Sequence, residues 1–128
     1  MCIKHYGVDI MTEKVKKKSS TRHIPAYILL FLAKQNLYGA ALLNIMQKEL
    51  PYFLIDGAVI YRTMQVLEKE GSVKSYWETD VSGPARKWYE ITDIGKEKLA
   101  EFKKDIEMRK KNLEFFLEDY SKLFDIES

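Results

Sequence analysis

Residues 75–92, SYWETDVSGPARKWYEIT, have the pattern of a β-hairpin. Aromatic and β-branched residues, which favour strands, lie at both ends of the stretch, and a Ser-Gly-Pro turn lies between them. We therefore expect one strand over residues 73–78, a tip over residues 79–86 and a second strand over residues 87–91.

The aromatic residues of this hairpin divide between its two faces. Strand alternation places Trp77, Tyr89 and Ile91 on the same side as Val73, which predicts that they form the hairpin core. Trp88 points the other way. It could be exposed, cover the end of a helix or line a ligand pocket.

Two adjacent cations, Arg86 and Lys87, follow the turn. Charged residues in a hairpin are commonly explained by solubility alone. Here Gly83 and Pro84 make the tip narrow and stiff, so that it can approach a nucleic-acid groove, and arginine is favoured in narrow minor grooves. We therefore interpret both cations as DNA contacts. Lys74, in the first strand, either contacts phosphate or is solvated.

Three helical segments precede the hairpin. Apolar spacing predicts the first from about residue 23 to residues 35–36, with Pro25 in its first turn. The second begins at residues 38–39 and ends at LPYF, residues 50–53. The third runs from a capping aspartate to a terminal glycine, residues 56–71. Its inward residues are expected to be Ile60, Met64 and Leu67.

After the hairpin, a long helix is expected to begin at Thr92 and to reach about Phe124. Apolar residues repeat along it with heptad spacing, interrupted only by Arg109. So long a stripe cannot be buried entirely against a three-helix core, and we expect it to pair with a second copy in a twofold-symmetric homodimer. The residues predicted to form this contact are Leu99, Phe102, Ile106, Leu113, Phe116, Tyr120 and Leu123.

Three helices followed by a hairpin is the element order of a winged helix-turn-helix, in which the third helix enters the DNA major groove. The predicted fold class is therefore mainly α, with a small β component (α+β). We divide the chain into a basic N-terminal arm over residues 1–22, a winged helix-turn-helix domain over residues 23–91 and a dimerisation helix over residues 92–128. The lysines at the end of the arm either contact phosphate or are solvated.

The composition, with 46% hydrophobic and 31% charged residues in a chain of 128, is that of a soluble globular protein. No apolar run is long enough for a membrane span, and the N-terminus lacks a signal peptide, so we expect a cytoplasmic protein. The net charge of +2 is local: residues 1–22 carry +4, residues 23–91 are neutral and residues 92–128 carry −2. DNA binding must therefore depend on where the cations lie.

Catalytic and metal-binding patterns are weak. Cys2, the single cysteine, excludes an internal disulfide and agrees with a reducing compartment. Cys2 and His5 have ligand-like spacing, but only His23 could join them, whereas zinc sites use about four ligands. No glycine-rich phosphate loop or nucleophile–base grouping is present. We expect no metal, no cofactor and no enzymatic activity.

Three stretches resemble the PadR family of bacterial transcriptional regulators. LYGAALL (37–43) resembles the start of the family's second helix, and VIYRTMQVLEKEGSV (59–73) is similar to its recognition-helix signature. SGPARKWYEITDIGKEKL (82–99) is similar to its wing. The resemblance covers roughly residues 23–100, and the recognition-helix and wing versions are similar to the subgroup described as polyhydroxybutyrate-responsive repressors.

The resemblance implies a dimeric repressor that binds double-stranded DNA and is often released by a small hydrophobic or aromatic effector. Tyr61 falls on the recognition-helix tyrosine of the family. The wing positions are Gly83, Pro84, Arg86 and Lys87. The chain departs from the family pattern at Arg62, where proline is common, and the departure adds a cation to the DNA-facing side.

The third helix carries the remaining candidate DNA contacts. Tyr61 and Arg62 are either a half-buried tyrosine beside a solvated arginine or a pair that faces DNA. Given the helix-turn-helix order, we favour DNA, with Arg62 bound to a phosphate or to a guanine edge and Gln65 bound to a base edge or a phosphate. Lys69 either contacts phosphate or is solvated.

In this family, effectors tend to sit at the dimer interface. Four aromatic residues could form a cavity there, although core packing is the alternative for each of them. They are Tyr27, Phe31, Phe102 and Phe116.

The sequence therefore predicts a sequence-specific DNA-binding transcriptional regulator, a repressor that binds a palindromic operator as a dimer. The alternative is a winged-helix module that binds a protein as a co-regulator without direct DNA contact, which the neutral charge of residues 23–91 keeps open. Salt dependence separates the two, because only DNA binding should weaken steeply as salt rises.

Overall fold

The computed structural model describes residues 22–53, 56–79 and 83–125. The helices are α2 (Ile24–Lys34), α3 (Gly39–Glu49), α4 (Gly57–Lys69) and α5 (Asp93–Phe124), and the strands are β1 (Leu37–Tyr38), β2 (Val73–Glu78) and β3 (Arg86–Ile91). The three short helices, the hairpin and the long last helix are confirmed. The predicted N-terminal arm, except Arg22, lies outside the described residues, as do Cys2 and His5.

Local chemistry sets both ends of α4. The Asp56 carboxylate accepts the backbone N–H of Val59 at 3.2 Å, which satisfies one of the free donors of the first turn. At the other end Gly71 has φ +82°, a conformation that glycine adopts without strain. The Ser72 N–H then reaches back to the Leu67 carbonyl at 2.9 Å, which closes a Schellman turn and stops the helix.

The start of α5 is tied to this same turn. The Thr92 hydroxyl accepts the N–H of Gly95 at 3.1 Å and donates to the Gly71 carbonyl at 2.5 Å. The Thr92 N–H in turn donates to the Ser72 carbonyl at 3.1 Å. The cap that begins the long helix therefore also fixes its position against the end of α4.

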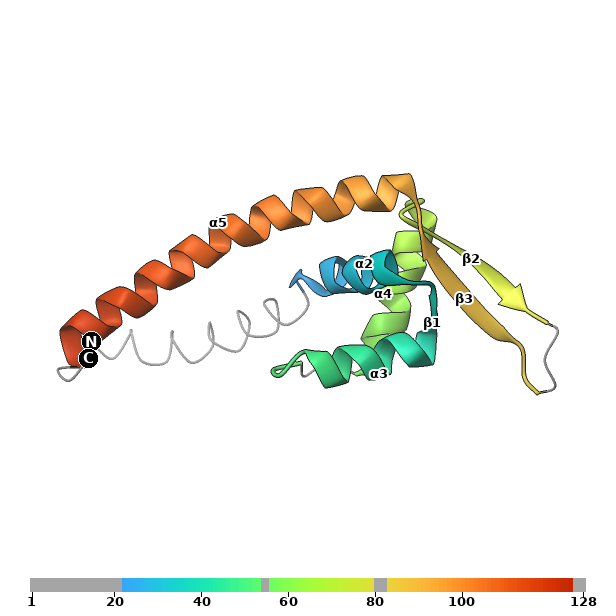
Figure 1. Cartoon of the computed structure of the whole chain (residues 1–128), viewed down its shortest axis with the longest axis horizontal. Helices are drawn as coiled ribbons and strands as arrows, with labels where there is room; N and C mark the ends of the chain where they lie inside the picture. Colours follow the sequence, from blue (N-terminus) through green and yellow to red (C-terminus); the bar gives the residue numbers. More distant parts are fainter. Residues whose placement is uncertain (1–21, 54–55, 80–82, 126–128) are drawn as a thin grey trace, which may run out of the picture.

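The sheet has three antiparallel strands in the order β1-β3-β2 (Figure 1). The predicted hairpin is present, with β3 beginning one residue earlier than expected, at Arg86. The third strand, β1, was not predicted, because two residues are too short to show an alternating pattern. It pairs Leu37 with Tyr89 and Tyr38 with Trp88, so the helix-turn-helix and the hairpin share one sheet.

Helix α2 lies at the centre of the domain, packed against α5 on one side and against α4, α3 and β3 on the others. Its buried residues form the middle of a single core to which every helix and strand of the domain contributes. The fully buried apolar side chains include Ile28, Leu29, Leu32, Leu42, Met46, Ile60, Met64, Leu67 and Val73.

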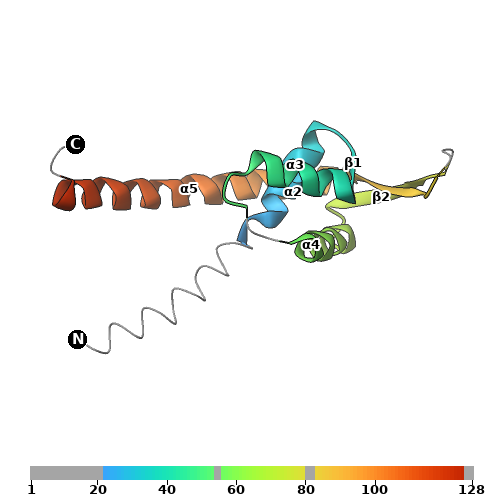
Figure 2. The ribbon, with the colours of Figure 1, turned by 90° about the horizontal axis from the view of Figure 1, so that it is seen from below.

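Helix α5 begins at the sheet, passes along α2 and then extends well beyond the domain (Figures 1 and 2). Leu99 and Phe102 pack against the core, whereas the side chains of residues 110–118 are all exposed. None of the described helices is both long and apolar enough to cross a membrane.

Candidate nucleic-acid interface

Helix α4 buries one face and presents a polar face to solvent. Ile60, Met64 and Leu67 are buried, as predicted. Across the exposed side, a hollow of about 470 Å³ is lined by Arg62, Gln65, Val66, Glu68 and Lys69. Within the described part of the chain, the side chains of Arg62, Gln65 and Lys69 have no hydrogen-bond or ion-pair partner, which leaves their donors available to another molecule.

Tyr61 combines partial exposure, 42%, with a close structural contact. Its ring lies over Gly39, where a Cβ would come within 2.3 Å of the tyrosine Cε1, and it also approaches Gly57. Gly39 is the first residue of α3, so the ring holds α4 against the start of the neighbouring helix. Tyr61 is thus a spacer between the two helices as well as a candidate DNA contact.

Glu68 fixes the hairpin to α4. It accepts the Ser75 hydroxyl at 2.5 Å and the Lys87 ammonium at 3.4 Å, one from each strand. The Ser75 hydrogen bond, opposed by burial and assisted by the charge of Lys87, holds the pKa of Glu68 below its usual value. Burial works to lower the pKa of Lys87, but the nearby Tyr89 and Glu68 raise it above its usual value. The pair therefore stays ionised at neutral pH.

The two wing cations point to opposite faces of the hairpin, because they are consecutive residues of β3. Lys87 faces α4, whereas the Arg86 guanidinium lies 4.7 Å from the centre of the Tyr38 ring, a cation–π contact on the other side. Neither residue belongs to the loop. The tip itself contains Gly83, with φ +124°, and a Cβ placed there would meet no atom of the described residues beyond its chain neighbours within 4 Å.

Lys74 is the remaining cation of the hairpin. Its ammonium lies 3.7 Å from a carboxylate oxygen of Glu90 on the paired strand, and its side chain is 64% exposed. At this exposure such a pair holds the lysine weakly, so Lys74 remains available to a phosphate.

The predicted hairpin core is correct for Tyr89 and Val73, which are buried, and Ile91 is half-buried. It is wrong for Trp77, whose side chain is 60% exposed. Trp77 does lie on the same face as Val73, opposite Lys87. The physical reason is that α4 covers this face only near its base, and Trp77 lies farther out toward the tip.

Trp88 packs against β1, the strand that was not predicted. Its half-buried indole meets the ring of Tyr38, the N-cap of α3, edge-on, with centroids 5.1 Å apart. Its buried Nε1 has no hydrogen-bond partner among the described residues. Of the three interpretations left open by the sequence, the packing against the start of a helix is the one observed.

The four aromatic residues considered for an effector do not come together within one chain. Tyr27 and Phe102 line an apolar groove of about 480 Å³ between α2 and α5. Phe31 is 6% exposed and belongs to the core, and Phe116 lies farther along α5, 64% exposed. Only the first two therefore share a hollow.

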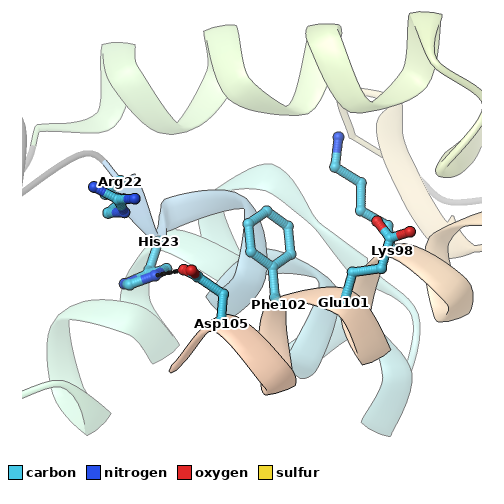
Figure 3. Close-up of a pocket in the computed structure, with 6 residues that line it drawn as sticks. All are labelled: Arg22, His23, Lys98, Glu101, Phe102 and Asp105. Atoms are coloured by element: carbon cyan, nitrogen blue, oxygen red, sulfur yellow. Dashed lines mark hydrogen bonds and ion pairs between the residues drawn. The ribbon is translucent and has the colours of Figure 1, made fainter. Parts of the chain in front are cut away.

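A polar cluster beside this groove fixes α5 against the start of α2 (Figure 3). His23 Nε2 lies 3.1 Å from an oxygen of Asp105, and the same oxygen accepts Arg109 Nε at 3.0 Å. The ring of His23 also meets that of Phe102 edge-on. Arg109, the residue that interrupts the heptad stripe, thus binds within its own helix to the carboxylate that holds His23.

The predicted dimer residues divide into two groups. Leu99, Phe102 and Ile106 are half-buried near the domain. The distal group is between 49% and 72% exposed. It consists of Leu113, Phe116, Tyr120 and Leu123. Phe115, Leu117 and Phe124 widen this exposed apolar surface.

Sequence reasoning did not identify the residues that hold the interface in place, namely Glu68, Ser75 and Tyr38. Their partners lie across the fold, and no local spacing relates them. Asn36 belongs with them, because its amide donates to the Tyr76 hydroxyl at 3.2 Å and links β2 to the turn after α2.

Comparison with known proteins gives a consistent result. The model of the family described as "Transcriptional regulator PadR-like family" matches residues 28–101. An "Uncharacterized protein X" from Lysinibacillus sphaericus is 30% identical over 97 residues, which cover 75% of this chain and 89% of that protein.

Solved structures agree. A PadR family transcription regulator from Clostridium difficile R20291 has a TM-score of 0.66 at 26% identity, covering 74% of this chain and 98% of that one. A PadR-like transcriptional regulator from Bacillus cereus has a TM-score of 0.65 at 27% identity, covering 74% of this chain and 91% of that one.

Proposed function

The chain belongs to the transcriptional regulator PadR-like family, and from that premise we propose that it binds a palindromic operator as a homodimer and represses transcription there. The family consists of regulators of transcription rather than enzymes. The observation that carries the proposal is the exposed face of α4, where Arg62, Gln65 and Lys69 have no partner among the described residues.

Helix α4 is the recognition helix in this proposal. Its polar face enters the major groove, where Gln65 bonds to a base edge or a phosphate. Arg62 binds a phosphate, or O6 and N7 of a guanine, and Lys69, at the end of α4, binds the DNA backbone. Tyr61 contacts the DNA backbone through its exposed edge, while its ring keeps α4 at a fixed angle to α3.

The hairpin is the wing, which follows the adjacent minor groove. Gly83 allows the tip to approach the groove closely, and Arg86 leaves the Tyr38 ring to reach it. Lys87 and Lys74 are ion-paired in the free protein. Because phosphate competes with these carboxylates, both lysines can exchange partners when the wing meets DNA.

A homodimer would bring two such domains to one operator. Burying a stripe of four large apolar side chains that are otherwise exposed favours association, and heptad spacing allows the two copies of α5 to pack along one seam. A twofold axis between the helices requires an operator with the same symmetry.

We further propose that a small hydrophobic or aromatic effector binds the groove formed by Tyr27 and Phe102 and releases the protein from DNA. The groove lies between α2 and α5, and its lining is apolar. An occupant there would change the angle between the long helix and the domain. In a dimer, that angle determines the spacing of the two α4 helices.

The decisive experiment is selection of bound duplexes from a random DNA pool, followed by gel shift with the recovered site. Arg62→Ala and Arg86→Ala should each weaken binding roughly tenfold and lower the slope of log K against log salt by about 1. The control is Lys104→Ala, an exposed cation of α5 outside this face. Unchanged affinity in both arginine variants would refute the assigned face.

If no duplex is recovered, the co-regulator alternative is favoured, in which the same surface binds a protein. Binding that weakens steeply between 50 and 200 mM salt is expected only for DNA. A recovered sequence without twofold symmetry would contradict the dimeric part of the proposal while leaving DNA binding intact.

A further inference from the structure

Trp77 is the largest exposed side chain of the wing, at 60%. It occupies the next-to-last position of β2, on the hairpin face that is turned toward α4. Along this face Val73 is buried and Ser75 bonds to Glu68, but Trp77 extends past the part that α4 covers. Its position is set by strand pairing directly opposite Lys87.

The other two large aromatic residues of the hairpin have structural partners. Tyr76 accepts a hydrogen bond from Asn36, and Trp88 packs on Tyr38 with its Nε1 buried. Among the described residues, Trp77 has neither a ring contact nor a hydrogen bond to its indole N–H. The described part of the domain gives the indole no partner, so its ring face and its N–H are available to a binding partner.

The surroundings of Trp77 indicate the chemistry of that partner. Lys87 lies opposite on the paired strand, while Lys69 and Arg62 line the hollow on α4. Glu68, which also lines that hollow, bonds to Ser75 on the strand of Trp77, so this strand is joined to the cationic side of α4. An exposed aromatic ring beside a lysine matches a nucleic-acid backbone, in which anionic phosphates alternate with apolar sugar faces. Apolar wedges and stacking rings are recurrent in DNA-binding surfaces.

We propose that Trp77 is a DNA contact, whose indole packs against a deoxyribose or base edge between the site of α4 and the site of the wing. This inference rests on the proposed function and extends it. The contact is apolar, so it contributes affinity without neutralising a phosphate. It therefore differs in kind from the contacts of Arg62 and Arg86.

The difference gives a test. With a fluorescently labelled duplex recovered from the random pool, Trp77→Ala should lower affinity by between about fivefold and a hundredfold, the range expected from stacking energies. The slope of log K against log salt should stay that of the wild type, whereas Arg62→Ala lowers it. Trp77→Phe keeps an aromatic ring and should retain most of the affinity.

A second measurement reports on the ring itself. The chain contains two tryptophans, so in Trp88→Phe all tryptophan emission comes from Trp77. Acrylamide should quench this emission strongly in the free protein and markedly less in the complex. The duplex affinity of Trp88→Phe should match the wild type, because Trp88 faces away from the proposed contact.

The outcomes are separable. If the wild type binds no duplex, the proposed function fails, and this inference fails with it. If the wild type binds but Trp77→Ala binds equally well, or acrylamide reaches Trp77 equally in the complex, DNA binding stands and this inference is overturned. A lowered salt slope in Trp77→Ala would also overturn it, because the contact would then be electrostatic.

Discussion

Gly95 lies in the first turn of α5, where the helix crosses the turn that follows α4, and replacing it with alanine tests this junction. A Cβ at position 95 would lie 2.1 Å from the carbonyl oxygen of Ser72 and 2.7 Å from Cγ1 of Ile91. Carbon and oxygen do not approach so closely without a bond. The Ser72 carbonyl already accepts the Thr92 N–H, so the backbone on both sides must move.

The expected cost follows from the structure. Overpacking of this kind costs about 1–3 kcal/mol, and weakening a hydrogen bond of the Thr92 cap adds about 1 kcal/mol. Replacing a glycine by alanine within a helix stabilises the helix by up to about 1 kcal/mol. We therefore expect Gly95→Ala to lower the free energy of unfolding by about 2 kcal/mol, which moves the urea midpoint by about 1 M at fixed protein concentration.

Gly39→Ala is the matched control, because the obstacle there is a side chain rather than backbone. Its Cβ would lie 2.3 Å from the Tyr61 ring, which is partly exposed and can rotate away. It should cost clearly less stability than Gly95→Ala. An unchanged midpoint for Gly95→Ala, or a larger loss for Gly39→Ala, would refute the inferred rigidity of the α4–α5 junction.

Two further predictions concern the wing and the long helix. Because the pKa of Glu68 is lowered on folding, its carboxylate stabilises the fold above its unfolded pKa of about 4.3, and this contribution is lost as the pH falls through the lower folded pKa. Glu68→Gln should therefore be less stable than the wild type at pH 7 in urea unfolding, and this difference should shrink as the pH falls below about 4. A difference that does not change with pH would contradict the pairing with Ser75 and Lys87. Phe116→Glu places a charge in the exposed stripe of α5 and should raise the dimer dissociation constant, measured by sedimentation, at least about tenfold. Lys111→Glu, outside the stripe, should leave this constant unchanged. A dimer unaffected by Phe116→Glu would place the interface elsewhere.

The order of the helices and the hairpin, and the ends of the helices, were predictable because they depend on neighbours in the chain. Asp56 caps α4, Gly71 ends it and Thr92 begins α5 through hydrogen bonds that span three to five residues or through backbone conformation alone. Helical spacing likewise identified Ile60 and Met64 as core, because a repeat of 3.6 residues determines which residues share a face.

The candidate interface was predictable only as a set of residues. Spacing places Arg62 and Gln65 on one exposed flank, and that flank is exposed. Residue spacing does not reveal that Lys87 pairs with Glu68, 19 positions away, or that the Tyr61 ring rests on Gly39, 22 positions away.

Trp77 marks the boundary between what the sequence determined and what the tertiary structure decided. Alternation correctly put it on the same face as Val73, because side chains of a strand alternate regardless of context. Whether a face is covered depends on the length and position of the element packed against it, which no local pattern encodes. Here α4 covers Val73 and Ser75 but not Trp77, so the same face is core at its base and exposed to solvent near its tip.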